Sequence, residues 1–155
     1  MKKVIIASDG GARGNGSDNC VSAYGALLIL EGSEYKKEIS KGFIGKTNNI
    51  MELLGFIEAL KCLNQPCEID AYLDSKYVLD GCQSWLAGWK RNNWITSTKK
   101  PVKNVELWQE LDQLIQKHKI NYIWVKGHNN HPLNERCDEL ANIEMDKLES
   151  DKKRN

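Results

Sequence analysis

Four acidic residues lie at the predicted ends of strands or within predicted helices, although they are far apart along the 155-residue chain. Asp9 follows the apolar run 4–7 and precedes two glycines, and Asp74 ends a strand-like stretch. Glu52 lies near the start of one helical pattern and Asp138 within another. Gathering four carboxylates at one point costs several kcal/mol in repulsion unless cations neutralise them. If the fold does gather them, the pattern favours a divalent-metal site for phosphoryl-transfer chemistry.

Each of these acids also has a purely local explanation. Asp9 could be a turn residue before its glycines, and Asp74 could cap the short helix that follows it. Glu52 follows Asn49 by three residues and fits a capping box. Asp138 could be one more acid on the solvent-exposed face of the last helix. Taken singly, each local explanation is favoured; taken together, the four positions favour a shared site beyond the ends of strands.

Hydrophobic periodicity predicts one α/β domain in which three strands precede an alternation of helices and strands. Strands are expected at 3–9, 21–31, 34–43, 68–73 and 120–126, and helices at 50–63, 75–83, 101–117 and 132–148. Pro101 and Pro132 are expected in the first turns of the last two helices.

This order predicts a five-stranded mixed sheet flanked by helices. The first three strands form an antiparallel meander, and the other two enter by helical crossovers. We expect a single domain over residues 1–148, followed by a charged tail, 149–155, that frays.

The composition is that of a soluble globular chain, with 41% hydrophobic and 28% charged residues. No segment approaches the ~20 apolar residues of a membrane span, and the apolar run after Lys3 is too short for a signal peptide. The five cysteines are irregularly spaced and show no zinc-binding pattern, so reduced thiols are expected. These features predict a cytoplasmic protein with no membrane association.

A near-neutral net charge conceals one strongly basic segment. Residues 85–104 contain no acid, and without their five positive charges the net charge of +1 becomes −4. Such asymmetry suits a polyanion bound on one side and a metal-loaded acidic centre on the other. Tryptophans alternate with the bases here and are expected to pack together, leaving the bases to contact phosphates. The five bases are Lys90, Arg91, Lys99, Lys100 and Lys103.

The histidines admit two interpretations. His128 and His131 lie in a loop just before the helix that carries Asp138. A zinc site could use all three, but their spacing is not a standard zinc pattern. A loop histidine near a metal–carboxylate centre is better suited to moving protons or assisting product release. His118 is interpreted as a cation at the end of a helix.

In chain order, the motifs of this sequence resemble those of type 1 ribonuclease H. Together, and at compatible spacing over residues 3–143, they form a very specific signal. The resemblance implies the ribonuclease H-like fold and an endoribonuclease that hydrolyses the RNA strand of RNA–DNA hybrids, giving 5′-phosphate and 3′-hydroxyl ends. The matching stretches are Asp9-Gly10, Thr47-Asn48-Asn49, Met51-Glu52-Leu53, Asp74-Ser75, Tyr77-Val78, 85–94, 100–105, Leu107-Trp108, 124–128 and 134–141.

The resemblance also implies roles for individual residues. Two magnesium ions, for which manganese is a possible substitute, would be held by Asp9, Glu52, Asp74 and Asp138. One ion would activate the attacking water and the other would stabilise the leaving 3′ oxygen. His128 would assist proton movement or product release. The residues expected to contact substrate are Asn15, Thr47, Asn48, Asn49, Lys76, Trp85, Lys90, Arg91, Lys99, Lys103 and Asn104.

Within that set, Thr47 and Asn104 match positions that grip a DNA phosphate. Asn15, Asn48 and Asn49 match positions near the minor groove, where 2′-hydroxyls distinguish RNA from DNA. Recognition would therefore depend on the shape of the hybrid and not on its sequence.

The chain departs from the common family pattern at three places, none of them a proposed metal ligand. The loop after the first acid reads Asn15-Gly16-Ser17, without the usual proline. Ile50 stands where arginine is common, and Lys76 where glutamine is common.

Two other functions compete with this interpretation. A hybrid- or duplex-binding module without cleavage would be favoured if one of the four acids were missing, and none is. A nuclease or integrase that acts on DNA usually has three acids and lacks the basic tryptophan segment. The enzyme is expected to act as a monomer without an obligate protein partner.

Overall fold

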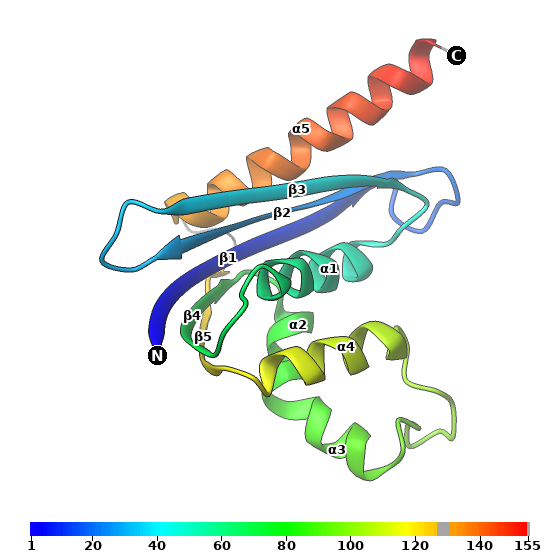
Figure 1. Ribbon diagram of the computed structural model, residues 1–155. Coiled ribbons are helices and arrows are strands. Elements are labelled where there is room, and N and C mark those ends of the chain that lie inside the picture. The colour runs from blue at the N-terminus through cyan, green and yellow to red at the C-terminus, as the bar shows by residue number, and fades with distance from the viewer. Residues whose placement is uncertain (127–130, 155) are drawn as a thin grey trace.

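The computed structural model describes residues 1–126 and 131–154 and shows a five-stranded mixed sheet with helices on both faces (Figure 1). The strands lie side by side in the order β3-β2-β1-β4-β5. The first three form an antiparallel meander, whereas β4 runs parallel to β1 and β5 parallel to β4. This confirms the predicted fold class. The strands are β1 (Lys2–Arg13), β2 (Val21–Leu30), β3 (Lys36–Ile44), β4 (Cys67–Leu73) and β5 (Lys119–Trp124).

One long helix covers one face of the meander, and the shorter helices gather on the opposite face (Figure 1). The long helix α5 packs on β1, β2 and β3, while α1 packs on β1 and β2 and is itself covered by α4. None of the helices within the described ranges has the length and apolar character of a membrane span. The helices are α1 (Asn48–Lys61), α2 (Lys76–Asp80), the π-helical turn η1 (Gly81–Trp85), α3 (Leu86–Arg91), α4 (Val105–Ile115) and α5 (Pro132–Arg154).

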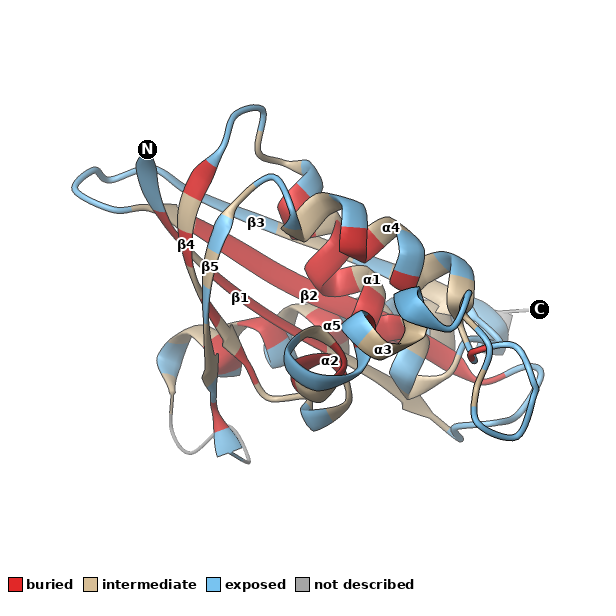
Figure 2. Ribbon diagram, turned by 90° about the horizontal axis from the view of Figure 1, so that it is seen from below, coloured by how far each residue is buried: buried red, intermediate tan, exposed pale blue. Residues whose placement is uncertain are grey.

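The core lies on both faces of the central strands. Residues 21–28 of β2 are all buried, a pattern expected of a strand covered on both sides. Ile6 and Phe56 belong to the larger cluster between the sheet and α1, and Ala23 and Met145 to a smaller cluster under α5. Figure 2 shows the buried residues as a band along β1 and β2 and on the side of α1 that faces them.

Two glycines allow helices to approach the central strands more closely than any side chain would permit. A Cβ at Gly10 would lie 2.5 Å from the carbonyl carbon of Met51 and 2.6 Å from the backbone nitrogen of Glu52 in α1. A Cβ at Gly25 would lie 2.3 Å from the carbonyl oxygen of Cys137 in α5. Because these neighbours are backbone atoms, a side chain at either position would push the helix away from the strand. The two glycines thus set the distance between the sheet and the helices that carry two of the four acids.

The first predicted strand and the helix predicted from Pro101 have different bounds in the structure. The first strand does not end at Asp9, because β2 continues to pair with β1 as far as Arg13 and Val21. The helix predicted from Pro101 begins only at Val105, and Pro101 instead pairs with Ile95 in an isolated β-bridge. In both cases pairing with a neighbouring segment of the chain determines the backbone conformation.

The last helix is longer than predicted. It begins at Pro132 as expected but continues to Arg154, so that residues 149–154 are helical where a separate tail was expected. Its last turns are tied to the body of the protein. Glu149 Oε1 lies 3.1 Å from Arg13 Nη1, and Lys152 donates a hydrogen bond to the carbonyl oxygen of Asn19.

His118 is not the helix-end cation predicted from the sequence. Its Nδ1 accepts a hydrogen bond of 3.0 Å from the backbone N–H of Cys67, the first residue of β4. Burial lowers the pKa of His118 below its usual value, and the charge of Lys117 lowers it further. A neutral imidazole therefore links the segment after α4 to the start of β4.

Replacing His118 with leucine is expected to cost about 1 kcal/mol near neutral pH, because the Cys67 N–H loses its acceptor. The folded-state pKa of His118 lies below the unfolded value of 6.5, so the stabilisation is fully present above that value and is lost as pH falls below it. Urea unfolding of both proteins across this pH range should show the difference shrinking as pH falls. A difference that stays constant would contradict the proposed role of the neutral imidazole.

Candidate active site

The register of the parallel strands brings Asp9 and Asp74 side by side. The pairing of β1 with β4 ends at Ser8 and Leu73, so the two acids occupy the next position on each chain. Asp9 remains within β1, where it pairs with Gly25 of β2. Asp74 directly follows the last residue of β4. The pair thus lies at the carboxyl end of the parallel strands, where ligands collect in sheets with crossover connections.

Glu52 joins this pair from α1. Thr47 caps the helix, because its Oγ1 accepts a hydrogen bond of 3.2 Å from the Ile50 N–H, and Glu52 lies in the second turn. Carboxylate oxygens of Asp9, Glu52 and Asp74, one from each residue, lie within 4.8 Å of one another. The structure therefore brings three of the four predicted acids into one cluster.

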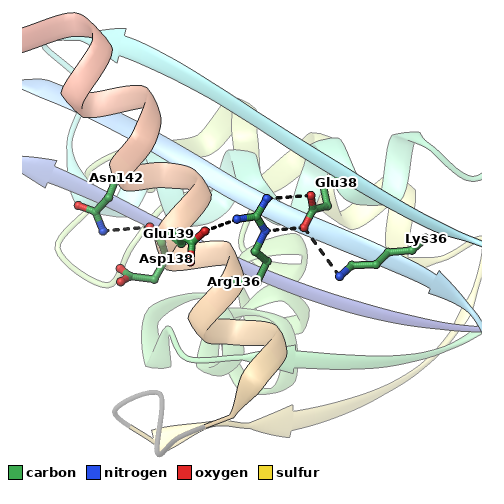
Figure 3. Close-up of polar contacts among 6 residues, drawn as sticks. All are labelled: Lys36, Glu38, Arg136, Asp138, Glu139 and Asn142. Carbon is green, nitrogen blue, oxygen red and sulfur yellow. Dashed lines mark hydrogen bonds and ion pairs between the residues drawn. The ribbon is translucent and has the colours of Figure 1, made fainter. Parts of the chain in front are cut away.

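Asp138 lies at the margin of that cluster. It is exposed on α5, and among the described residues the group of ligand atoms within 4.8 Å does not include it. It nevertheless lies close enough to Asp9 to influence the ionisation of Asp9 by its charge and by a hydrogen bond. Figure 3 shows the Asp138 carboxylate on the side of α5 away from Arg136 and Glu38.

Burial of the cluster makes the ionised acids costly. Burial, together with the charges and hydrogen bonds of Asp74 and Asp138, raises the pKa of Asp9 to about 9. Burial also raises the pKa of Glu52 well above its usual value, with the charges of Asp74 and Asp9 adding to the effect. A divalent cation would remove this cost, and carboxylate oxygens are the ligands that Mg²⁺ prefers. The donor set therefore fits a hard divalent metal.

The local explanations do not account for the three clustered acids. Asp9 is not a turn residue, because it lies within a strand. Asp74 does not cap α2, since the Oγ of Ser75 accepts the hydrogen bond that caps this helix. Glu52 does not form the predicted capping box, because Thr47 is the cap of α1. The fourth acid is exposed on its helix, as its local explanation predicted.

The histidine predictions have different outcomes. His128 lies outside the described residues. His131 stacks on Tyr72 with ring centroids 4.7 Å apart, and the carboxylate cluster of the described residues does not include it.

Sequence reasoning gave no role to Asn134 beyond its place in a motif. It is fully buried, and its Nδ2 donates a hydrogen bond of 3.1 Å to the carbonyl oxygen of Tyr72. This contact ties the start of α5 to β4, two residues before Asp74. The signal available in the sequence was an asparagine at helical spacing from the apolar positions Cys137, Ala141 and Met145.

The tryptophans of the basic segment pack on one another, as predicted. Trp85 and Trp89 have ring centroids 5.6 Å apart, and Trp89 also contacts Trp94 at 6.3 Å. The cluster is anchored by Trp108 of α4, which is fully buried and lies 5.2 Å from Trp89. The segment is therefore mounted on the body of the protein through aromatic packing.

The bases of this segment differ in their surroundings. Lys90 Nζ lies 3.3 Å from both carboxylate oxygens of Asp112, a buried residue of α4, although no acid is near it in the sequence. Arg91, Lys99 and Lys103 are exposed. Lys90 thus holds the segment on α4, and the exposed bases present their charges to solvent.

Two further predicted substrate residues make contacts within the protein. The Asn104 side chain donates a hydrogen bond of 3.2 Å to the Tyr77 hydroxyl, which also accepts one from Trp108 Nε1 at 2.9 Å. Lys76 Nζ lies 4.6 Å from the ring centroid of Trp124. Both contacts fix side chains near the carboxyl ends of β4 and β5.

The predicted minor-groove residues lie close to the acid cluster. Asn15 Oδ1 accepts a hydrogen bond of 3.0 Å from the backbone N–H of Asn48, the first residue of α1. Asn49 is the next residue and is exposed. These amides therefore lie about one helical turn from Glu52.

Comparison with known proteins identifies the family. The sequence model of the RNase H family matches residues 1–146. Ribonuclease H from Clostridium botulinum is 53% identical over 149 residues, which cover 96% of this chain and 99% of that protein. The chain belongs to the RNase H family. The predicted resemblance to type 1 ribonuclease H and the predicted enzyme class are thus confirmed.

Solved structures agree with this RNase H in fold. The crystal structure of LC9-RNase H1, described as a type 1 RNase H with the type 2 active-site motif, superposes with a TM-score of 0.81 at 26% identity. The superposed region covers 91% of this chain and 71% of the LC9-RNase H1 chain. LC11-RNase H1 in complex with RNA/DNA hybrid superposes with a TM-score of 0.67 at 22% identity and covers 94% and 98%.

Without metal, Asp9→Asn is expected to stabilise this RNase H, because the amide removes a buried acid from beside two others. The raised pKa of Asp9 means that its contribution to stability is fully present at acid pH and is lost as pH rises through about 9. The variant should therefore exceed its parent by at least about 1 kcal/mol at pH 8, with a smaller difference at pH 5. Urea unfolding in EDTA measures both values. A variant that unfolds more readily than its parent at pH 8 would contradict the electrostatic account.

Proposed function

We propose that this RNase H hydrolyses the RNA strand of RNA–DNA hybrids by metal-assisted phosphodiester cleavage. The main support is the convergence of Asp9, Glu52 and Asp74 within 4.8 Å, with Asp138 beside Asp9. Relatives of the same length are named ribonuclease H, and a solved neighbour of the same fold is bound to an RNA/DNA hybrid.

The four acids would hold the metal, which we expect to be two Mg²⁺ ions, with Mn²⁺ as a substitute. When bound, such ions would activate the attacking water and stabilise the leaving 3′ oxygen. The products would carry 5′-phosphate and 3′-hydroxyl ends. Asp9 and Asp74 would be the least mobile ligands, because one lies within a paired strand and the other directly after a strand. His128 would serve in proton movement or product release.

The substrate would lie across the strand ends, between the acid cluster and the basic segment. The exposed Arg91, Lys99 and Lys103 would contact backbone phosphates, which provide affinity without sequence preference. Asn15 and Asn48 would face the minor groove, where 2′-hydroxyls identify the RNA strand. Placed one helical turn from Glu52, they would select RNA next to the reacting phosphate.

The first test is cleavage of an end-labelled RNA–DNA hybrid with Mg²⁺, beside RNA duplex, DNA duplex and an EDTA control. Cleavage should require Mg²⁺ and be confined to the RNA of the hybrid. Asp74→Asn should lower the rate by about two orders of magnitude or more, because it removes one charge from the cluster.

Asp70→Asn is the matched control, since Asp70 lies on β4, four residues before Asp74, but accepts a hydrogen bond from Asn121 and is outside the cluster. It should cleave like the parent. Binding of the hybrid by the parent without cleavage would contradict the proposal and favour a binding module.

Neutralising Arg91, Lys99 and Lys103 to glutamine is expected to weaken hybrid binding and flatten its salt dependence. Each lost phosphate contact reduces the slope of log K against log salt by about 0.9, so the slope should fall by roughly two to three. Binding of a non-cleavable hybrid at several salt concentrations measures the slope.

Lys90→Gln is the comparison variant, because Lys90 is already paired with Asp112. It should lower the free energy of unfolding of the protein and leave the slope of log K against log salt close to that of the parent. If the triple variant had the same salt slope as the parent, the basic segment would not be part of the binding surface.

A further inference from the structure

Asp138 is held in place differently from the other three acids. Asp9 and Asp74 are fixed by strand register, and Glu52 by the close contact of α1 at Gly10. Asp138 is exposed on α5, so its distance from Asp9 depends on how that helix lies against the sheet. A contact that fixes this turn of α5 relative to β1 would control the geometry of the fourth acid.

Arg13 makes such a contact. It lies four residues after Asp9 on β1, and residues at this spacing in a strand point to the same face. Its Nη1 lies 2.8 Å from Asp146 Oδ1 and 3.1 Å from Glu149 Oε1, and its Nη2 donates a hydrogen bond of 2.8 Å to Asn142 Oδ1. One guanidinium on the strand of Asp9 thus binds three residues of α5.

Asn142 connects this guanidinium to Asp138. While its Oδ1 accepts the bond from Arg13, its Nδ2 donates a hydrogen bond of 2.9 Å to the carbonyl oxygen of Asp138 (Figure 3). Both ends of the amide are therefore engaged, one with the strand and one with the backbone of the acidic residue. The path from Arg13 to Asp138 contains a single side chain.

We propose that Arg13 and Asn142 are positioning residues for Asp138, which hold its turn of α5 at the distance from Asp9 that metal binding requires. The inference rests on the proposed metal-assisted function. It extends that function, because it names residues outside the acid cluster that would determine how tightly the site binds metal.

Other contacts show that this link is not needed merely to attach α5. Arg136 binds Glu38 of β3 at 2.7 and 3.1 Å, as Figure 3 shows. Ser40 donates a hydrogen bond of 3.1 Å to Glu144, and Gly25 of β2 lies against the α5 backbone. These contacts secure α5 to β2 and β3. Cys137 also packs with Ala7 of β1, next to Asp138. Loss of the Arg13 link should therefore change the orientation of Asp138 and leave the helix attached to the sheet.

The test compares Arg13→Gln and Asn142→Ala with the parent. The Mg²⁺ concentration that gives half-maximal hybrid cleavage should rise by roughly tenfold in both, as expected when a group that orients a metal ligand is lost. The KM for hybrid at saturating Mg²⁺ should stay within about twofold, because neither residue belongs to the substrate surface. The double variant should be no worse than either single one, because both changes break the same path.

Two control variants separate positioning from stability. Glu149→Gln removes an ion pair from the same guanidinium but leaves Asn142 in place, so it should keep the parental Mg²⁺ requirement. Arg13→Lys keeps the charge and a donor and should recover part of the effect. An equal shift in Glu149→Gln, or none in Asn142→Ala, would overturn the proposal.

A second readout does not depend on cleavage. Substoichiometric Mn²⁺ should broaden the amide NMR signals around Asp9 and around Asp138 in the parent without substrate. In Asn142→Ala about tenfold more Mn²⁺ should be needed for the same broadening, because a metal ligand has lost the group that orients it. Equal broadening in parent and variant would contradict the positioning role, even if the chain did not cleave hybrid. Failure of the parent to cleave, with broadening intact, would instead contradict only the proposed function.

Discussion

The burial of Asp9 and Glu52 beside Asp74 is the constraint on which the rest of this structure depends. Burial and mutual repulsion both favour the protonated acids, so the fold must supply packing that keeps them together without a cation. That packing comes from β1, which pairs with strands on both sides, and from the contact of α1 at Gly10. Bringing these acids together thus lowers the stability of the folded protein, as expected at a site that is arranged for binding.

The remaining parts of the molecule are arranged around this cluster on separate supports. The helix α5 carries Asp138 and is bound to the meander by two arginines, Arg13 from the strand side and Arg136 from the helix side. The basic segment is mounted on α4 through packed tryptophans and the Lys90–Asp112 pair. Because these supports use different residues, we expect substitutions to alter the proposed polyanion binding and the metal geometry separately.

Much of the fold could be predicted because local patterns determine it. The alternation of apolar residues gave the strands and their order along the chain. Two of the four acids were assigned to strand ends, one to a helix start and one to the last helix. What the sequence could not show depends on distant partners. The continuation of β1 past Asp9 requires the pairing with β2, and the neutral state of His118 requires the Cys67 N–H. The pairing of Lys90 with Asp112 likewise crosses between elements, as does the path from Arg13 to Asp138.

The central claim is that the clustered acids are a metal site, in which burial and mutual repulsion raise the pKa values of Asp9 and Glu52 and a bound cation would favour their ionised forms. Calorimetric titration of the protein with Mg²⁺ at pH 7, in buffers of different ionisation enthalpy, tests it most directly. The account predicts that binding releases protons, because carboxyls held protonated by burial must ionise to coordinate the metal, and that Asp9→Asn reduces this release. Binding without proton release, or release unchanged in the variant, would contradict the account.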